Sequence, residues 1–134
     1  MFRVMHISIK KEIFYEMLSH CLREGPLEAC GFLSGAGEII EKMHKMKPLN
    51  DAAASFNPSE TFRVSGEIQA LGHKWLGVFR AHAADGRPTQ TDIDFSTDPD
   101  VVQFIVALSD EGLPVIKAYR IEGGKADEIH IEIE

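Results

Sequence analysis

The sequence has few of the features that mark an exported or membrane-bound chain. Only two cysteines, Cys21 and Cys30, occur among its 134 residues, too few for the disulfide framework of a small secreted protein. No apolar run approaches the roughly 20 residues that a membrane helix needs, and the first residues lack the continuous apolar core of a secretion signal. These absences predict a cytoplasmic chain with reduced thiols. Cys30 lies in an apolar stretch and is expected to be buried and inert.

Positive charge is also scarce. The chain has 14 basic against 21 acidic residues, for a formal net charge of −7. A chain of this sign repels phosphate backbones, and no basic stretch is long enough to follow one, so nucleic acid is not expected as a partner. A length of 134 residues with 44% hydrophobic residues is ordinary for a globular protein, and it predicts a single domain over residues 1–134.

Hydrophobic periodicity predicts strands and helices in the first two thirds of the chain. Residues 3–7 alternate as a short strand, and a helix is expected over residues 9–23, capped by Ser8 and ended by Gly25. The segments "ACGFLSG" and "GEIIEKMHKMKPLN" predict a hairpin. A second helix is expected from Asn57 to about His73, followed by the strand "WLGVFRAH".

The last third predicts one more helix and a closing hairpin. Asp98-Pro99 is typical of a helix start, and an apolar stripe follows it as far as Gly112 (Val101, Val102, Ile105 and Leu108). "PVIKAYRI" and "ADEIHIEIE" predict two strands joined by a glycine turn. Hairpins outnumber crossovers, so the predicted class is α+β, with a mixed sheet flanked by helices. The final strand offers an edge that a second copy could cover, which leaves a homodimer open.

The stretch "VFRAHAADGRPTQTDID" joins a buried strand to a polar loop. Side chains two apart on a strand point the same way, so Arg80 and His82 are expected to project together, with Leu76 and Val78 on the same face. Asp92 follows ten residues after His82, across a loop long enough to return a carboxylate. A catalytic zinc takes three ligands from His, Asp or Glu and keeps a fourth position for water, and this stretch offers two of the three.

Over nearly its whole length the sequence resembles the JAB/MPN domains of the JAMM metalloprotease family, most of all the short prokaryotic members. The family pattern is "P-x-E-x-C-G-x-L-x-G", then "H-S-H-P" and "S-x-x-D", and the chain offers "PLEACGFLSG" with Glu28, "RAHA" with His82 and "PTQTD" with Thr89 and Asp92. The resemblance implies a layered fold similar to that of cytidine deaminases. It also implies zinc held by His82 and Asp92, with Glu28 as general base and Thr89 at the oxyanion. The implied substrate is the C-terminal glycine tail of a ubiquitin-like or sulfur-carrier protein.

The second segment departs from the family pattern at several positions. Arg80 stands for the first histidine, Ala83 for the proline and Thr89 for the serine. A rival register would use Thr91 and Asp94 as the serine and the aspartate. The proline before Thr89 favours the first register, since a proline often stands there in the family.

Arg80 leaves two functions open. A guanidinium has no lone pair to give a cation, and at about 4 Å from a dication it would cost roughly 8 kcal/mol at an effective dielectric of about 20. We therefore expect Arg80 to take the metal's place and bridge Glu28 and Asp92. His44 and His73 are the imidazoles that could replace the missing ligand, although neither is obviously placed. The first function is a metal-free domain that binds a partner or a polypeptide tail without hydrolysis, and the second is a zinc-dependent metallopeptidase or isopeptidase.

Overall fold

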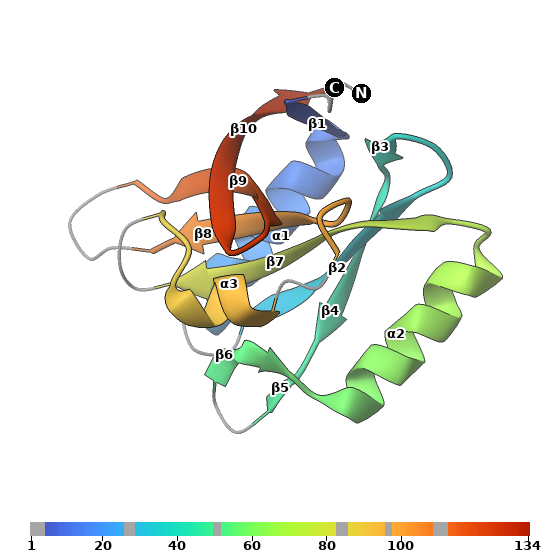
Figure 1. The fold of residues 1–134 in the computed structure, drawn as a ribbon. Coiled ribbons are helices and arrows are strands. Elements are labelled where there is room, and N and C mark those ends of the chain that lie inside the picture. The colour runs from blue at the N-terminus through green and yellow to red at the C-terminus, as the bar shows by residue number, and fades with distance from the viewer. Residues whose placement is uncertain (1–4, 26–28, 50–51, 83–85, 96–97, 109–112) are drawn as a thin grey trace.

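In the described part of the chain, a mixed sheet of eight strands is the main structural element (Figure 1). A computed structural model of the chain describes residues 5–25, 29–49, 52–82, 86–95, 98–108 and 113–134. The helices are α1 (Lys11–Glu24), α2 (Pro58–Ala70) and α3 (Gln90–Phe95). The strands are β1 (His6–Ile9), β2 (Cys30–Gly35), β3 (Ile39–Ile40), β4 (Lys42–Met46), β5 (Pro48–Leu49), β6 (Ala52–Phe56), β7 (Lys74–His82), β8 (Val102–Ala107), β9 (Val115–Glu122) and β10 (Lys125–Ile133).

The main sheet has the strand order β3-β1-β10-β9-β8-β7-β2-β4, and β5 pairs with β6 separately. The pairs β1 with β10, β1 with β3 and β7 with β8 are parallel, and the other neighbours in the main sheet are antiparallel. The predicted α+β class with a mixed sheet flanked by helices is confirmed. Within the described ranges, no helix is long and apolar enough to cross a membrane.

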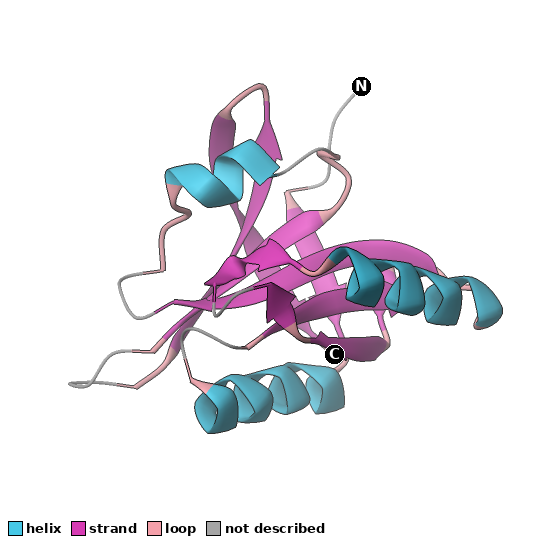
Figure 2. Cartoon of the chain, turned by 90° about the horizontal axis from the view of Figure 1, so that it is seen from below, coloured by secondary structure: helices cyan, strands magenta, loops and turns pink. Residues whose placement is uncertain are grey.

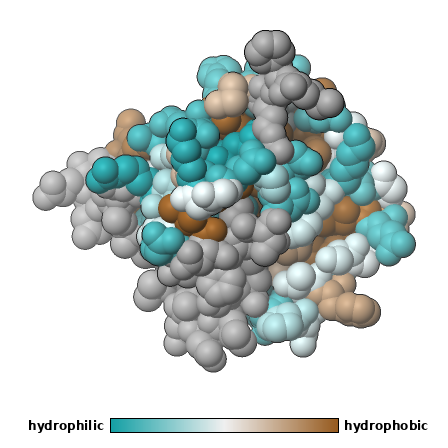
Figure 3. Space-filling model, in the orientation of Figure 1, coloured by the Kyte–Doolittle hydropathy of each residue, from teal (hydrophilic) through white to brown (hydrophobic). Residues whose placement is uncertain are grey.

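Two apolar clusters on opposite faces of β7 hold the helices to the sheet. Met17 of α1 belongs to the larger cluster, together with Phe79 of β7. Val64 of α2 packs in a second cluster with Val78, the neighbour of Phe79 along the strand. Successive side chains of a strand point to opposite faces, so α1 and α2 cover different faces of the sheet, as Figure 2 shows. α3 lies on the α2 side, where Ile93 packs against Ile105 of β8. On the face shown in Figure 3, hydrophilic residues lie beside smaller hydrophobic patches.

The predicted helices in the first half of the chain are confirmed with one change of cap. Asn57 caps α2, since its side chain accepts a hydrogen bond from the N–H of Ser59 at 3.0 Å. Gly25 ends α1 with a φ of 83°, which favours glycine. The prediction that Ser8 caps α1 is wrong, because Ser8 belongs to β1 and the N-cap position is Lys10.

The helix predicted to start at Asp98-Pro99 is wrong. Residues 102–107 form the central strand β8, parallel to β7 and antiparallel to β9. Every residue from Val101 to Ala107 is buried, because both faces of this strand are covered. A strand buried on both faces reads as a continuous apolar run, in which a helical stripe is easily found by chance.

The closing hairpin is confirmed, but its last strand is not an open edge. β10 pairs antiparallel with β9 on one side and parallel with β1 on the other, in a register that runs from His6 opposite His130 to Ile9 opposite Ile133. The N-terminal strand therefore covers the edge that the sequence had left open to a second copy.

Candidate functional site at the end of β7

Arg80 and His82 lie together at the C-terminal end of β7. Arg80 is 2% exposed and stands opposite Cys30 of β2 and Ile105 of β8. The expectation that Val78 and Leu76 share their face is wrong for Leu76. Leu76 packs in the α1 cluster instead, because the register between β2 and β7 shifts beside it and interrupts the alternation.

α3 supplies Asp92 through a capping box. Thr89 precedes the first residue of α3, and its hydroxyl oxygen accepts the N–H of Asp92 at 3.2 Å. In return the N–H of Thr89 donates to Oδ2 of Asp92 at 2.7 Å, and the Thr89 hydroxyl donates to the same oxygen at 3.1 Å. This reciprocal pairing needs a hydroxyl and an acid three residues apart, which is the spacing of the "S-x-x-D" pattern. The pattern therefore positions Asp92 as well as Thr89.

Asp92 is the centre of the cluster. It is fully buried, and Nε2 of His82 lies 3.3 Å from its Oδ2. Nη1 of Arg80 lies 3.4 Å from its Oδ1 and also donates to Oε1 of Gln103 at 3.1 Å. Gln103 is a buried polar residue of β8 that the sequence reasoning missed, although a glutamine inside the apolar run "VVQFIVAL" was a visible signal.

The cluster keeps the carboxylate ionised. Burial by itself would raise the pKa of Asp92, but hydrogen bonds from His82 and Thr89, together with the charges of His82 and Arg80, hold that pKa below its ordinary value. Burial lowers the pKa of Arg80, and the charge of Asp92 opposes the shift. A guanidinium starts from so high a pKa that it stays protonated. The pair is therefore a buried guanidinium beside a buried carboxylate.

Several predicted site residues cannot be placed in the cluster. Glu28 lies outside the described residues, so its contact with Arg80 stays a prediction. Thr91 and Asp94 fall within α3, but their side chains lie outside what is described.

His44 and His73 lie elsewhere. His44 Nε2 and His73 Nδ1 both contact the hydroxyl of Ser34, at 2.8 and 3.0 Å. Ser34 is four residues along β2 from Cys30, the partner of Arg80, a separation of about 13 Å. Neither imidazole is placed to supply a ligand beside His82.

Ser34, His44 and Glu67 are arranged like the serine, histidine and acid of a hydrolase triad, because Nδ1 of His44 also lies 3.1 Å from Oε2 of Glu67. Ser34 is fully buried, however, and no substrate can reach its hydroxyl. Cys30 is also fully buried, and burial raises its pKa to about 11. Neither residue is a nucleophile in this structure.

The side chains around Asp92 do not fit a three-ligand zinc site. Within the described ranges, no three His, Cys, Asp or Glu side chains are grouped to hold a metal ion. Nε2 of His82 and Oδ2 of Asp92, the atoms that would bind zinc, face each other instead. The third position beside them holds the guanidinium of Arg80, which is no ligand.

Comparison with known proteins agrees with the architecture, although no family model matches the sequence. The chain is 24% identical over 131 residues to a CysO-cysteine peptidase of Mycobacterium tuberculosis, which covers 93% of this chain and 89% of the relative. A solution structure of a protein from Desulfitobacterium hafniense matches with a TM-score of 0.81 and 29% identity, and covers 96% of this chain and 92% of that one.

Two further solved structures give the fold its name. A JAB1/MPN domain protein from Archaeoglobus fulgidus matches with a TM-score of 0.63 at 18% identity and covers 96% of both chains. A structure described as a JAMM metalloprotease-like zinc site in the proteasome and signalosome matches with a TM-score of 0.62 at 19% identity, over 96% of this chain and 97% of that one. The chain has the JAB1/MPN fold and resembles the JAMM proteins.

Proposed function

We propose that this chain is a single JAB/MPN domain that works without a metal ion and binds the C-terminal tail of a ubiquitin-like or sulfur-carrier protein without cutting it. The observation that carries the proposal is the ion pair of Arg80 with Asp92. The pair puts a fixed positive charge beside the carboxylate, where a JAMM site would hold zinc.

The geometry of Asp92 supports a metal-free site. Its Oδ2 is already contacted by Thr89 and His82, and its Oδ1 by Arg80. A dication bound to Asp92 would have to break the contact between His82 and Asp92, and Arg80 would repel it, at a cost of several kcal/mol. Without zinc, nothing in the described cluster lowers the pKa of a water molecule or polarises a peptide carbonyl. The proposed activity is therefore recognition of a tail rather than its hydrolysis.

A protein tail is the proposed ligand because of what the chain resembles. The curated relative is named a peptidase, and peptidases bind an extended polypeptide. We also propose a cytoplasmic location, which suits the two free and buried thiols of Cys21 and Cys30.

The second candidate function is a zinc-dependent metallopeptidase or isopeptidase. It is favoured by the gathering of His82, Asp92 and Thr89 at one place, which is what the JAMM pattern requires of them. In this function His82 and Asp92 would hold the metal, Glu28 would be the base, and Arg80 would have to leave the cluster.

Metal analysis decides between the two candidates. The protein is purified without a metal-binding tag, incubated with equimolar zinc, passed through a desalting column and measured by inductively coupled plasma mass spectrometry. We expect much less than one zinc per chain. For Arg80→His we expect zinc retention to rise, because a third imidazole replaces the repelling cation. One zinc per chain in the unaltered protein would favour the metallopeptidase.

Tail binding is measured separately. A ubiquitin-like or sulfur-carrier protein from the same genome is titrated by isothermal calorimetry, in the presence and absence of EDTA, and its mass is then checked for cleavage. We expect saturable binding that is unaffected by EDTA and a tail of unchanged mass. Binding that EDTA abolishes, or a shortened tail, would contradict the proposal.

A further inference from the structure

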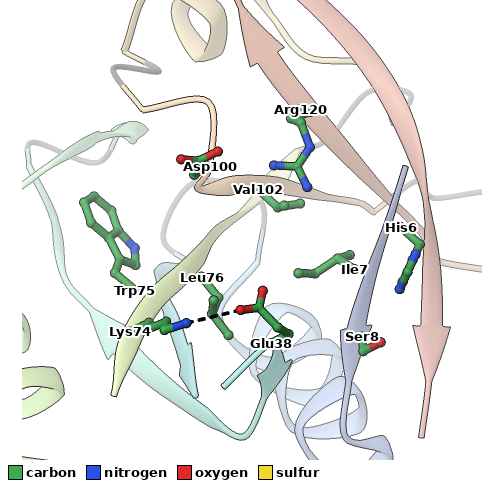
Figure 4. A pocket seen from close by; sticks show the side chains of 10 residues that line it. All are labelled: His6, Ile7, Ser8, Glu38, Lys74, Trp75, Leu76, Asp100, Val102 and Arg120. Atoms are coloured by element: carbon green, nitrogen blue, oxygen red, sulfur yellow. Dashed lines mark hydrogen bonds and ion pairs between the residues drawn. The ribbon is translucent and has the colours of Figure 1, made fainter. Parts of the chain in front are cut away.

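A cavity of about 590 Å³ opens at the other end of β7 (Figure 4). It lies where the first residues of β7 and β8 face β1 and β9, and its size is within the range of small-molecule sites. Lys74 lines it and is six residues from Arg80, about 20 Å along the strand. The cavity is therefore separate from the Asp92 cluster, and the proposal for it does not depend on the proposed function.

The cavity has an apolar floor and a charged rim. Ile7, Leu76 and Val102 form the floor and are all buried. Around them stand charged groups of both signs, which are Lys74 and Arg120 on the one hand and Glu38 and Asp100 on the other. The imidazole of His6 also lines the cavity. In Figure 4 the side chains of Lys74, Glu38 and Arg120 point toward the space above Val102 and Leu76. The chain has a net charge of −7, but the lining of this cavity has as many basic residues, Lys74 and Arg120, as acidic ones.

An ion pair spans part of the mouth. Nζ of Lys74 lies 3.2 Å from Oε1 of Glu38, and the two side chains are 61% and 87% exposed. So exposed a pair contributes little to stability and opens readily. Glu38 reaches Lys74 from the turn between β2 and β3, so its carboxylate is a tethered stand-in for the carboxylate of a ligand.

A ligand with a single charge would gain little binding free energy in this cavity. A simple carboxylate would replace Glu38 on Lys74, but it would compete with a carboxylate that the chain itself holds in place. A simple amine would compete with Lys74 for Glu38 in the same way. A zwitterion uses both members of the pair, since its carboxylate binds Lys74 and its ammonium binds Glu38. The cavity keeps the same net charge in the process.

We propose that this cavity binds a free α-amino acid with an apolar side chain. The carboxylate lies toward Lys74 and Arg120, the ammonium toward Glu38 and Asp100, and the side chain covers Leu76 and its neighbours on the floor. Arg120 is held at the wall by donating from Nη1 to the carbonyl oxygen of Pro99 at 3.0 Å, which fixes the position of the guanidinium.

The probe for the test is L-leucine, followed by two-dimensional amide NMR of the full chain. We expect saturable shifts at the amides of Ser8, Leu76 and Val102, which belong to three lining segments. Two analogues each lack one charge, namely 4-methylpentanoate without the ammonium and 3-methylbutylamine without the carboxylate. Each should bind about fivefold more weakly or worse, because it loses one ion pair of roughly 1 kcal/mol. Glycine, which lacks the apolar side chain, should also bind more weakly.

Variants assign the binding to this cavity. Lys74→Met and Glu38→Gln should each weaken leucine binding about fivefold, whereas Lys125→Met should not. Lys125 is the matched control because its ion pair with Asp127, at 3.7 Å, is also exposed and lies in a different part of the sheet. The proposal is overturned by any of three results, which are no saturable shift with L-leucine, equal binding of either analogue, or an equal loss in Lys125→Met. Zinc content and tail binding report on the Asp92 cluster alone.

Discussion

Replacing Asp92 by asparagine tests whether the Arg80 ion pair organises the site. Asparagine keeps the size of the side chain and an oxygen for the N–H of Thr89, but removes the negative charge. Arg80, at 2% exposure, would then be a buried cation beside a side chain that has lost its negative charge. Removing one member of a buried ion pair typically costs about 3–5 kcal/mol, because the other charge stays desolvated. We expect Asp92→Asn to lower the free energy of unfolding by an amount in that range.

The assay is urea and thermal unfolding followed by circular dichroism. A loss of about 3–5 kcal/mol in a chain of this size corresponds to a melting temperature lower by roughly 10 °C or more. Asp127→Asn is the control, since its ion pair with Lys125 is exposed and should contribute less than about 1 kcal/mol.

A double-mutant cycle separates the ion pair from the other contacts of Asp92. Arg80→Met removes the cation with little change in volume, although it also takes a donor from Gln103. If the two side chains are coupled, the loss in free energy of unfolding in the double variant should be smaller than the sum of the two single losses, by at least about 1.5 kcal/mol. Additive losses, or a loss below about 1 kcal/mol in Asp92→Asn, would refute the claim that Arg80 serves as the counter-charge.

Three further predictions concern the rest of the fold. Burial lowers the pKa of His44, so as the pH falls the unfolded chain takes up the proton before the folded chain does, and the free energy of unfolding should decrease below about pH 6.5. In unfolding curves measured at several pH values, His44→Gln should reduce this pH dependence. The same substitution at His130, which is exposed, should leave it unchanged. Burial raises the pKa of Cys30 to about 11 and that of Cys21 to about 12, so neither thiol should react with a disulfide reagent at pH 8 until urea unfolds the chain, and fast reaction of the native protein would contradict the described burial. Asn57→Ala should cost about 1 kcal/mol in urea unfolding, because the N–H of the first turn of α2 loses its acceptor.

Local signals in the sequence predicted the elements that local signals determine. Asn57-Pro58 gave the start of α2, Gly25 the end of α1, and the glycine turn the hairpin of β9 and β10. Pairing between segments far apart in the sequence could not be predicted. The parallel pairing of β1 with β10 joins residues 124 apart in the sequence, and no hydrophobic periodicity indicates it. The helix predicted in place of β8 has the same cause, because a strand takes its burial from neighbours that the sequence does not name.

The candidate site was predicted in part for the same reason. Arg80 and His82 were placed together correctly, since two residues apart on a strand is a local relation. The contact of Arg80 with Asp92 was expected only from the family pattern and from the charge of a guanidinium. α3 was missed, although Thr89 and Asp92 carry the spacing of a capping box. That spacing was assigned a catalytic role, and its role in capping α3 was missed.

The proposed site explains why an arginine, rather than a neutral residue, stands at position 80. Asp92 is fixed by the capping box of α3, so it stays buried whether or not a metal is present. A neutral side chain at position 80 would leave the buried carboxylate without a permanent positive charge among the described contacts. Arg80 supplies a permanent charge from a strand position that already points at Asp92, and Gln103 holds the guanidinium in place. On this argument Arg80, which we propose excludes zinc, also keeps α3 docked on the sheet, so Arg80→His should give a chain whose stability depends on added metal.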